Sequence, residues 1–244
     1  MDKITINLHK NVSTTIYRSK TTNLMIAVTN NRSPVIKGQI SFATEANDDR
    51  GIGHMVEHLV FMRSEKYPYK GFLDTVLNLC YSPDTSNART NIDNTEFDFS
   101  SIGTQPFLKV LEVYFDNLLA PLFTGYQYLT EVHYVNDKGE DSGVMFSEQM
   151  SKEHNMDILV GRLMDKLSYP EGHPYSYEPG GLASEIVKDT GRLSELTEYQ
   201  RKYFHLKNMV SKLKLKHYLN LKIKSPIPFQ NISNKFSRIL HLSI

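Results

Sequence analysis

Two histidines and a glutamate stand together in one short stretch, Gly53-His54-Met55-Val56-Glu57-His58. On a helix, His54 and His58 lie one turn apart on the same face, and two imidazoles at that spacing can hold one Zn²⁺. Glu57 projects near the same face, where it can accept a proton from a water that zinc activates. HxxEH, the reverse of HExxH, is the signature of inverted zinc peptidases. We expect one Zn²⁺ per chain, with His54 and His58 as ligands and Glu57 as the catalytic base.

The alternative is a surface helix whose two histidines and glutamate have no shared task. The residues around the motif argue against a surface helix. Met55, Val56 and the run Leu59-Val60-Phe61 place apolar side chains on nearly all sides of the helix. Such a helix is buried, and buried polar side chains need partners. A catalytic zinc also needs a third protein ligand. Spacing alone does not choose among the candidates, which are His133, Glu140, Glu148, Glu153, His154 and His173.

The elements that must position this motif follow from the hydrophobic pattern. Apolar and polar residues alternate in four early segments and one later segment, which predicts strands; these are Ile4–Leu8, Val12–Tyr17, Leu24–Val28, Val35–Phe42 and Thr95–Ser101. The first four suggest an antiparallel meander with one face buried. Helical periodicity marks a stretch from Gly51 to Met62, a shorter helix from Gly71 to near Cys80, and the segments Pro106–Leu119, Val144–Leu167 and Ser194–Phe204. This order predicts an α+β fold, a largely antiparallel sheet with helices packed on one face.

The charge is unevenly distributed, although the net charge of the 244 residues is only +1. Of the 28 Lys and Arg residues, seven lie in 211–244, where Asp and Glu are absent, which leaves 21 against 27 acidic residues in 1–210. The Lys/Leu alternation at 212–216 matches neither a clean helix nor a clean strand, so we expect a basic, poorly ordered tail. No pattern in the tail predicts a fold that would present its basic residues to RNA or DNA, so we expect no nucleic-acid partner. No run of 18 apolar residues suggests a membrane span.

One cysteine, Cys80, cannot build a disulfide framework, which fits a reducing compartment. The first residues lack the apolar core of a secretory signal. We therefore expect a cytoplasmic location, with the mitochondrial matrix as the alternative.

Motifs spread along the chain resemble the pitrilysin family of metallopeptidases, which includes insulin-degrading enzyme and presequence protease. They are Ala43-Thr44-Glu45 leading into the HxxEH stretch, Ser86–Thr90 followed by Asp93, Thr95 and Phe97, Gly143–Glu148, and His173-Pro174-Tyr175 with Gly180-Gly181. The resemblance runs from about Val12 to Met209 and is greatest to the long-chain branch that contains presequence protease.

The resemblance implies roles for three more residues. Glu148 would be the third zinc ligand, and Asn87 and Ala88 would lie on an edge strand that pairs with the substrate backbone. Two positions depart from the family pattern: Arg63 stands where relatives usually have Gly, and Asp141 where several have Glu. Both departures concern the surroundings of the site and leave the ligands in place.

The resemblance covers one domain of a larger enzyme. We predict an N-terminal zinc-binding peptidase domain over 1–210, followed by the tail over 211–244. Family enzymes enclose the substrate between two halves, so we expect a truncated product that needs a complementary peptidase half. The expected function is zinc-dependent endopeptidase cleavage of peptides or unfolded polypeptide. The alternative is a catalytically incompetent zinc-binding fragment that acts as a peptide binder or regulator, and a purely structural α+β domain is the third interpretation.

Overall fold

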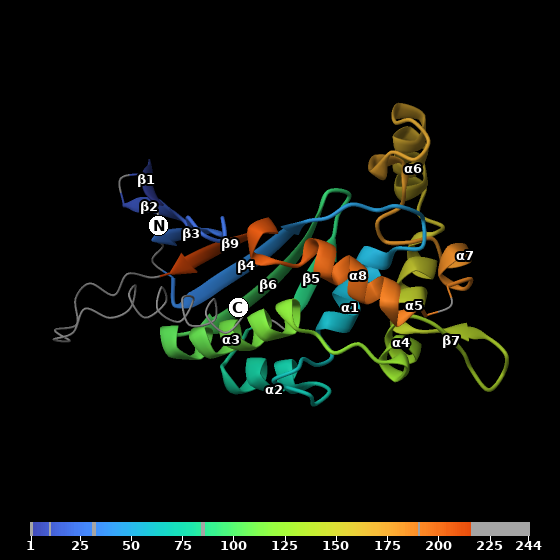
Figure 1. Cartoon of the computed structure of the whole chain (residues 1–244), viewed down its shortest axis with the longest axis horizontal. Coiled ribbons are helices and arrows are strands. Elements are labelled where there is room, and N and C mark those ends of the chain that lie inside the picture. The colour runs from blue at the N-terminus through green and yellow to red at the C-terminus, as the bar shows by residue number, and fades with distance from the viewer. Residues whose placement is uncertain (1, 10, 31–32, 84–85, 190, 216–244) are drawn as a thin grey trace.

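A seven-stranded sheet with helices on one face forms the body of the chain in the computed structural model (Figure 1). The structure describes residues 2–9, 11–30, 33–83, 86–189 and 191–215. The strand order is β1-β2-β3-β9-β4-β6-β5, and every pairing except β3 with β9 is antiparallel. The α+β class expected from the sequence is confirmed.

The predicted early strands are present as β1 (Asp2–His9), β2 (Val12–Arg18), β3 (Met25–Asn30) and β4 (Val35–Ala43). Strands β1 to β3 form the expected meander, but β9 separates β3 from β4. The expectation of one buried face holds for β3 and β4, whose inward residues include Ile26, Val28, Ile40 and Phe42. It is wrong for β1, which is exposed along all eight residues.

Strand β9 (Met209–Leu215) corrects our description of the tail, because it contains residues 211–215. It lies in the middle of the sheet, parallel to β3 and antiparallel to β4. The Lys/Leu alternation here is a strand pattern of period two: Leu213 is buried, and Lys212 and Lys214 face outward. The division at residue 210 stays a prediction, although β9 crosses it, and residues 216–244 lie outside the described residues.

Strand β6 (Asn94–Ile102) pairs with β4 over nine residue positions, and β5 (Asn87–Thr90) closes the sheet on its other side. The helices on one face are α1 (Ile52–Val60), α2 (Phe72–Leu79), α3 (Thr104–Leu119), α4 (Gly125–Glu131) and α8 (Leu193–Tyr203). Their apolar sides and the inward side chains of the sheet form one core that includes Phe97, Tyr114 and Leu118. Because α1 belongs to this core, the motif it carries is held rigidly against the sheet.

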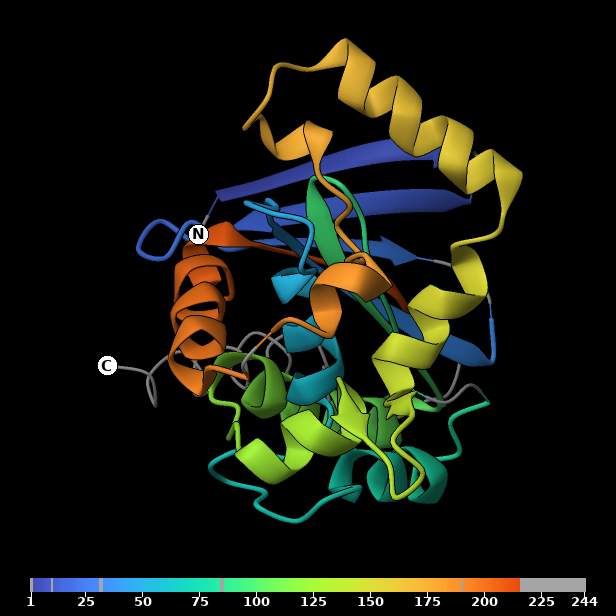
Figure 2. The same ribbon diagram turned by 90° about the vertical axis from the view of Figure 1, so that its right-hand side faces the viewer.

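The long helix expected over Val144–Leu167 is wrong, since the structure has two helices there, α5 (Val144–Lys152) and α6 (Met156–Ser168). Asn155 separates them, because its side-chain oxygen accepts hydrogen bonds from the backbone N–H groups of Asp157 and Ile158 and so begins a new helix. Helix α6 forms an outer edge of the molecule (Figure 2), while α5 contacts α1.

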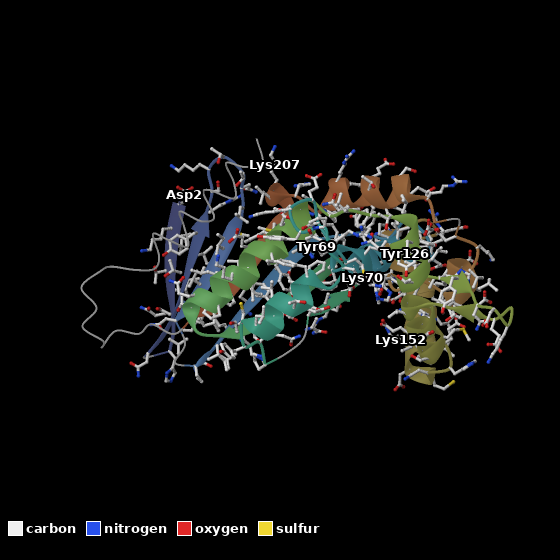
Figure 3. All side chains as sticks on the ribbon, turned by 90° about the horizontal axis from the view of Figure 1, so that it is seen from below. Asp2, Tyr69, Lys70, Tyr126, Lys152 and Lys207 are labelled. Carbon is white, nitrogen blue, oxygen red and sulfur yellow. The ribbon has the colours of Figure 1, made fainter. Side chains whose placement is uncertain are left out.

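The remaining elements are short. They are the hairpin β7 (Tyr134–Val135) with β8 (Asp141–Ser142), the helix α7 (Ala183–Ile186), and the 3₁₀ turns η1 (Pro174–Ser176) and η2 (Leu206–Asn208). Asp2 in β1 and Lys152 in α5 lie toward opposite ends of the long axis (Figure 3). In the part of the chain that the structure describes, no helix is long and apolar enough to cross a membrane.

Candidate metal centre

Helix α1 places His54, Glu57 and His58 at the junction of the sheet with α5 and α8. The apolar residues between them, Met55 and Val56, have no exposed surface, which fixes the rotation of the helix. His54 is 5% exposed and Glu57 7%, so these two polar side chains are buried, and His58 is partly buried. The two imidazole rings meet edge to face with centroids 4.7 Å apart, as residues one helical turn apart allow.

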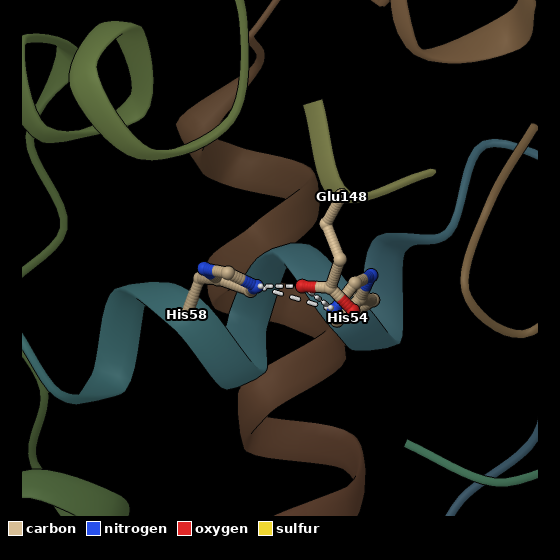
Figure 4. Close-up of side chains that lie close together, drawn as sticks. All are labelled: His54, His58 and Glu148. Carbon is tan, nitrogen blue, oxygen red and sulfur yellow. Dashed lines mark hydrogen bonds and ion pairs between the residues drawn. The ribbon is translucent and has the colours of Figure 1, made fainter. Parts of the chain in front are cut away.

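Glu148, in the second turn of α5, completes a cluster of three metal-binding side chains (Figure 4). The Nε2 atoms of His54 and His58 are 3.2 Å apart. Glu148 Oε2 lies 3.7 Å from His54 Nε2 and 3.5 Å from His58 Nε2. The three donor atoms therefore converge on one point, reached from two helices that are ninety residues apart in the sequence.

The backbone at Gly180 orients His54. The Nδ1 atom of His54 lies 3.0 Å from the carbonyl oxygen of Gly180, and a carbonyl only accepts, so Nδ1 carries the proton and Nε2 presents its lone pair to the cluster. The side-chain amide nitrogen of Gln149 lies 3.2 Å from the same Nδ1, and because that nitrogen only donates, it is not hydrogen-bonded to Nδ1 in this tautomer. Burial, reinforced by the neighbouring His58, lowers the pKa of His54 to about 4, so this imidazole is neutral at physiological pH.

Glu148 is ionised under the same conditions. Its hydrogen bond with His58 is the main cause that lowers its pKa to about 2, and a second contribution comes from Lys152, whose Nζ donates to Oε1 at 2.6 Å. Because Lys152 occupies Oε1, the other carboxylate oxygen, Oε2, faces the two imidazoles. The cluster thus combines two imidazoles and one carboxylate, a donor set typical of catalytic zinc.

Glu57 lies beside the cluster and is hydrogen-bonded to strand β5. Thr90 Oγ1 donates a hydrogen bond of 2.6 Å to Glu57 Oε2. Burial raises the pKa of Glu57, and the hydrogen bond from Thr90 opposes that rise. A buried carboxylate with a raised pKa beside a cluster of metal-binding groups has the properties of a general base.

Among the strands that the structure describes, β5 is at one edge of the sheet, so one row of its backbone groups has no described strand beside it. Ala88 and Thr90 lie opposite the buried Phe97 and Thr95 of β6 and so face the helices, whereas Asn87 and Arg89 are exposed on the opposite side. Ala88 packs against the core, and Asn87 is exposed. The structure thus brings Ala88 to the face that carries the cluster and places Asn87 on the other face.

Of the six candidates for the third ligand, only Glu148 joins the cluster within the described residues. The others have different environments. His133 lies 2.8 Å from Asp141, and Glu153 accepts a hydrogen bond from the backbone of Ala183. His173 stacks on Tyr169, and Glu140 and His154 are exposed.

Sequence reasoning missed four residues around the cluster, namely Thr90, Gln149, Lys152 and Gly180. Lys152 follows Glu148 by four residues, a spacing that allows an ion pair on a helix, and this is the one signal the sequence offered. Thr90 and Gly180 lie in motifs that resemble the family, but their contacts with Glu57 and His54, like that of Gln149, are identified only by the tertiary structure.

Comparison with known proteins agrees with the fold. The insulinase family, peptidase family M16, matches residues 42–153, which include the cluster. An uncharacterized protein of Caenorhabditis elegans is 40% identical over 195 residues, 80% of this chain and 19% of its own. Another from Saccharomyces cerevisiae is 38% identical over 193 residues, 78% of this chain and 18% of its own.

A third relative has a name that states an activity. Presequence protease 1 of Arabidopsis thaliana, described as chloroplastic/mitochondrial, is 30% identical over 184 residues, 69% of this chain and 16% of its own. The chain therefore spans less than a fifth of the length of the curated relatives it matches. On these matches and on the motifs they cover, the chain belongs to the insulinase family of peptidases and corresponds to its N-terminal domain.

Proposed function

We propose that this chain is a zinc-dependent endopeptidase domain that hydrolyses peptide bonds in peptides or unfolded segments. The observation that carries the proposal is the convergence of His54, His58 and Glu148 on one point, with Glu57 and the open edge of β5 beside it. The proposed ligands are these three residues, and Glu57 is the proposed general base.

The donor atoms fit zinc. A tetrahedral ion with bonds of about 2.0–2.1 Å separates its ligand atoms by about 3.4 Å. The separations here are 3.2, 3.5 and 3.7 Å, which bracket that value. Two imidazoles and one carboxylate also leave a fourth position for a reacting group, as catalytic zinc sites require. Zinc bound there would supply Lewis-acid polarisation of a water and of the peptide carbonyl.

Side chains of this chain would transfer the proton during the reaction. Glu57, ionised and desolvated, takes the proton of the attacking water and returns it to the leaving amine. Thr90 holds one oxygen of Glu57, which leaves the other free to face the reacting water. Burial of Glu57 brings its pKa closer to the pH at which it must both accept and release a proton.

The substrate would bind as an added strand along β5. An exposed edge offers backbone N–H and C=O groups that an extended peptide can pair with, and Asn87 and Ala88 are the proposed substrate-binding positions. Strand addition requires an extended substrate, which favours short peptides and unfolded segments over folded proteins.

The relatives' greater length makes the activity of the whole protein a separate proposal. We infer that full activity requires a complementary peptidase half, as the resemblance implies. The cytoplasm and the mitochondrial matrix both remain predictions; the Arabidopsis relative's name gives support to the second.

The deciding experiment measures bound zinc and peptide cleavage for the wild type, for Glu57→Gln and for the control Glu198→Gln, an exposed glutamate on α8. We expect about one zinc per chain in all three, with cleavage lost only in Glu57→Gln. Stoichiometric zinc without cleavage by the wild type would support the alternative function, a zinc-containing peptide binder. A chain that binds no zinc would refute both.

A further inference from the structure

The sheet face opposite the helices carries a hollow lined by lysines. It has a volume of about 330 Å³. Its lining includes Lys37 and Gln39 from β4, Asn87 from β5, Asp98 from β6, and Lys212 and Lys214 from β9. The hollow lies outside the candidate metal centre, which occupies the other face, and the two share strand β5.

The three lysines lie closer together than their charges favour. Lys37 and Lys214 are direct cross-strand partners in the β4–β9 pair, and Lys212 lies opposite Gln39, two positions along. Directly opposed side chains on one sheet face have Cβ atoms about 5 Å apart, and like charges in that position are destabilising. A sequence that keeps this arrangement in the middle of a sheet accepts a loss of stability.

The neighbouring carboxylates do not neutralise the lysines. Asp98 and Glu96 both pair with Arg89, at 2.9 and 3.6 Å, and Glu96 also accepts hydrogen bonds from Gln39 and Asn94. Among the described residues, no carboxylate lies within ion-pair distance of Lys37, Lys212 or Lys214. The segment 211–244 contains no Asp or Glu in its sequence, so it has no acidic side chain to offer.

We propose that this hollow binds acidic side chains of the peptide substrate, and so selects substrates with Asp or Glu several residues from the cleaved bond. This inference rests on the proposed function, because β5 connects the two sites. Thr90 at one end of β5 touches Glu57, and Asn87 at the other end lines the hollow. A peptide paired with β5 therefore leaves the edge next to the hollow.

The distances suit a short segment of substrate. Neighbouring strands are about 4.8 Å apart, so Lys37 on β4 lies about 10 Å across the sheet from β5. Lys212 and Lys214 on β9 lie one strand farther, about 14 Å from β5. An extended chain covers about 3.3 Å per residue, so about three residues beyond the edge reach Lys37 and about four reach the lysines of β9. Peptide is favoured over nucleic acid because the hollow has no exposed aromatic ring on which bases could stack: Phe99, which contributes to its floor, is 3% exposed.

The test uses the full chain carrying Glu57→Gln, so that peptides bind without being cleaved. Fluorescence anisotropy would measure the Kd of two labelled peptides that differ only in three consecutive Glu or Gln residues placed beyond the strand-pairing segment. The comparison is repeated with Lys37→Gln, Lys212→Gln and Lys214→Gln combined. The matched control combines Lys66→Gln, Lys138→Gln and Lys188→Gln. It also removes three positive charges, but at positions outside the sheet.

We expect the acidic peptide to bind about tenfold tighter than the neutral one at low salt, as several surface ion pairs together would give. The advantage should shrink as salt is added and disappear in the hollow variant, while the control variant keeps it. Thermal unfolding should show the hollow variant at least as stable as its parent, because it loses the Lys37–Lys214 repulsion.

Three outcomes would overturn the inference. They are equal binding of both peptides by the parent chain, equal loss of the preference in the control variant, and tighter binding of a single-stranded RNA of the same length through the same lysines. Zinc content and wild-type cleavage are measured separately, so failure of the endopeptidase proposal would be visible without this comparison.

Discussion

The hydrogen bond from Thr90 to Glu57 gives a quantitative test of the proposed general base. Replacing Thr90 with Val removes the hydroxyl and keeps the branched shape of the side chain, which suits a strand residue. Neither Thr90 nor its replacement contacts His54, His58 or Glu148, so the zinc content should not change. The substitution therefore acts on Glu57 alone.

The magnitude follows from the charge and burial of the acceptor. A hydrogen bond to a charged group contributes about 1.5–3 kcal/mol, and Glu57 is 7% exposed, with the bond at 2.6 Å. Since about 1.4 kcal/mol is a factor of ten in an equilibrium constant, losing the bond should favour protonated Glu57 by about ten- to a hundredfold and so raise the pKa of Glu57 further. The pKa of Glu57 rises because Thr90 donates a hydrogen bond to the ionised carboxylate. Without that donor, the protonated form becomes more stable relative to the ionised form.

Catalysis requires ionised Glu57, so the acidic limb of the pH profile of kcat/KM should move to higher pH by the same amount. At a pH below the wild-type limb, Thr90→Val should be about ten to a hundred times slower, and at high pH it should approach the wild type. Thr90→Ser restores a hydroxyl and should restore the wild-type limb. The titration of the Glu57 carboxyl by ¹³C NMR reads the same shift without requiring turnover.

Two results would refute this reasoning. One is an acidic limb of Thr90→Val at the wild-type pH, together with an unshifted NMR titration. The other is a Thr90→Ser variant that behaves as Thr90→Val does, since the effect would then come from packing and not from the hydroxyl.

Two further predictions concern the support around the cluster. Gly181 has a φ of +85°, and an added Cβ would lie 2.8 Å from the Arg50 carbonyl oxygen. Gly181→Ala should therefore lower the free energy of unfolding by about 2 kcal/mol or more and weaken zinc binding in a competition titration. An unchanged zinc affinity would contradict the role of the neighbouring Gly180 carbonyl. For the metal-free chain in chelator, the lowered pKa of His54 means that the unfolded state binds more protons between pH 6.5 and about 4, so stability should fall by about 3 kcal/mol as the pH drops through that range. The raised pKa of Glu57 has the opposite effect on the pH dependence of stability. Denaturant titrations of the wild type and of His54→Gln isolate the contribution of His54. Equal pH dependence of the unfolding free energy in both would disprove it.

Much of the site could be predicted because its chemistry is local. His54, Glu57 and His58 lie within five consecutive residues of one helix, and the apolar residues between them reveal both the helix and its burial. Glu148 is different: spacing left six candidates, and only the family resemblance favoured it. Thr90 and Gly180 reach the cluster from a distant strand and loop, and the family motifs that contain them do not show what they contact.

The errors in the fold have the same origin. Val144–Leu167 has continuous helical periodicity, and the break at Asn155 depends on one side chain that bonds to the backbone ahead of it. Residues 211–215 alternate as a strand does, but their basic composition suggested a tail. Their place between β3 and β4 is decided by pairing with strands about 180 residues earlier, and such long-range pairing leaves no signal in the segment itself.

The contact between the two imidazoles carries a prediction about protons. His54 donates Nδ1–H to Gly180, so its Nε2 has no proton while the ring is neutral. The 3.2 Å contact of His54 Nε2 with His58 Nε2 needs one proton, and His58 therefore supplies it as its Nε2–H tautomer. Zinc requires a lone pair on both Nε2 atoms. On titration with zinc, ¹⁵N NMR should show His58 moving its proton from Nε2 to Nδ1 while His54 keeps its proton on Nδ1. A tautomer change in His54, or none in His58, would contradict the role of the Gly180 carbonyl in aiming the first ligand before the metal arrives.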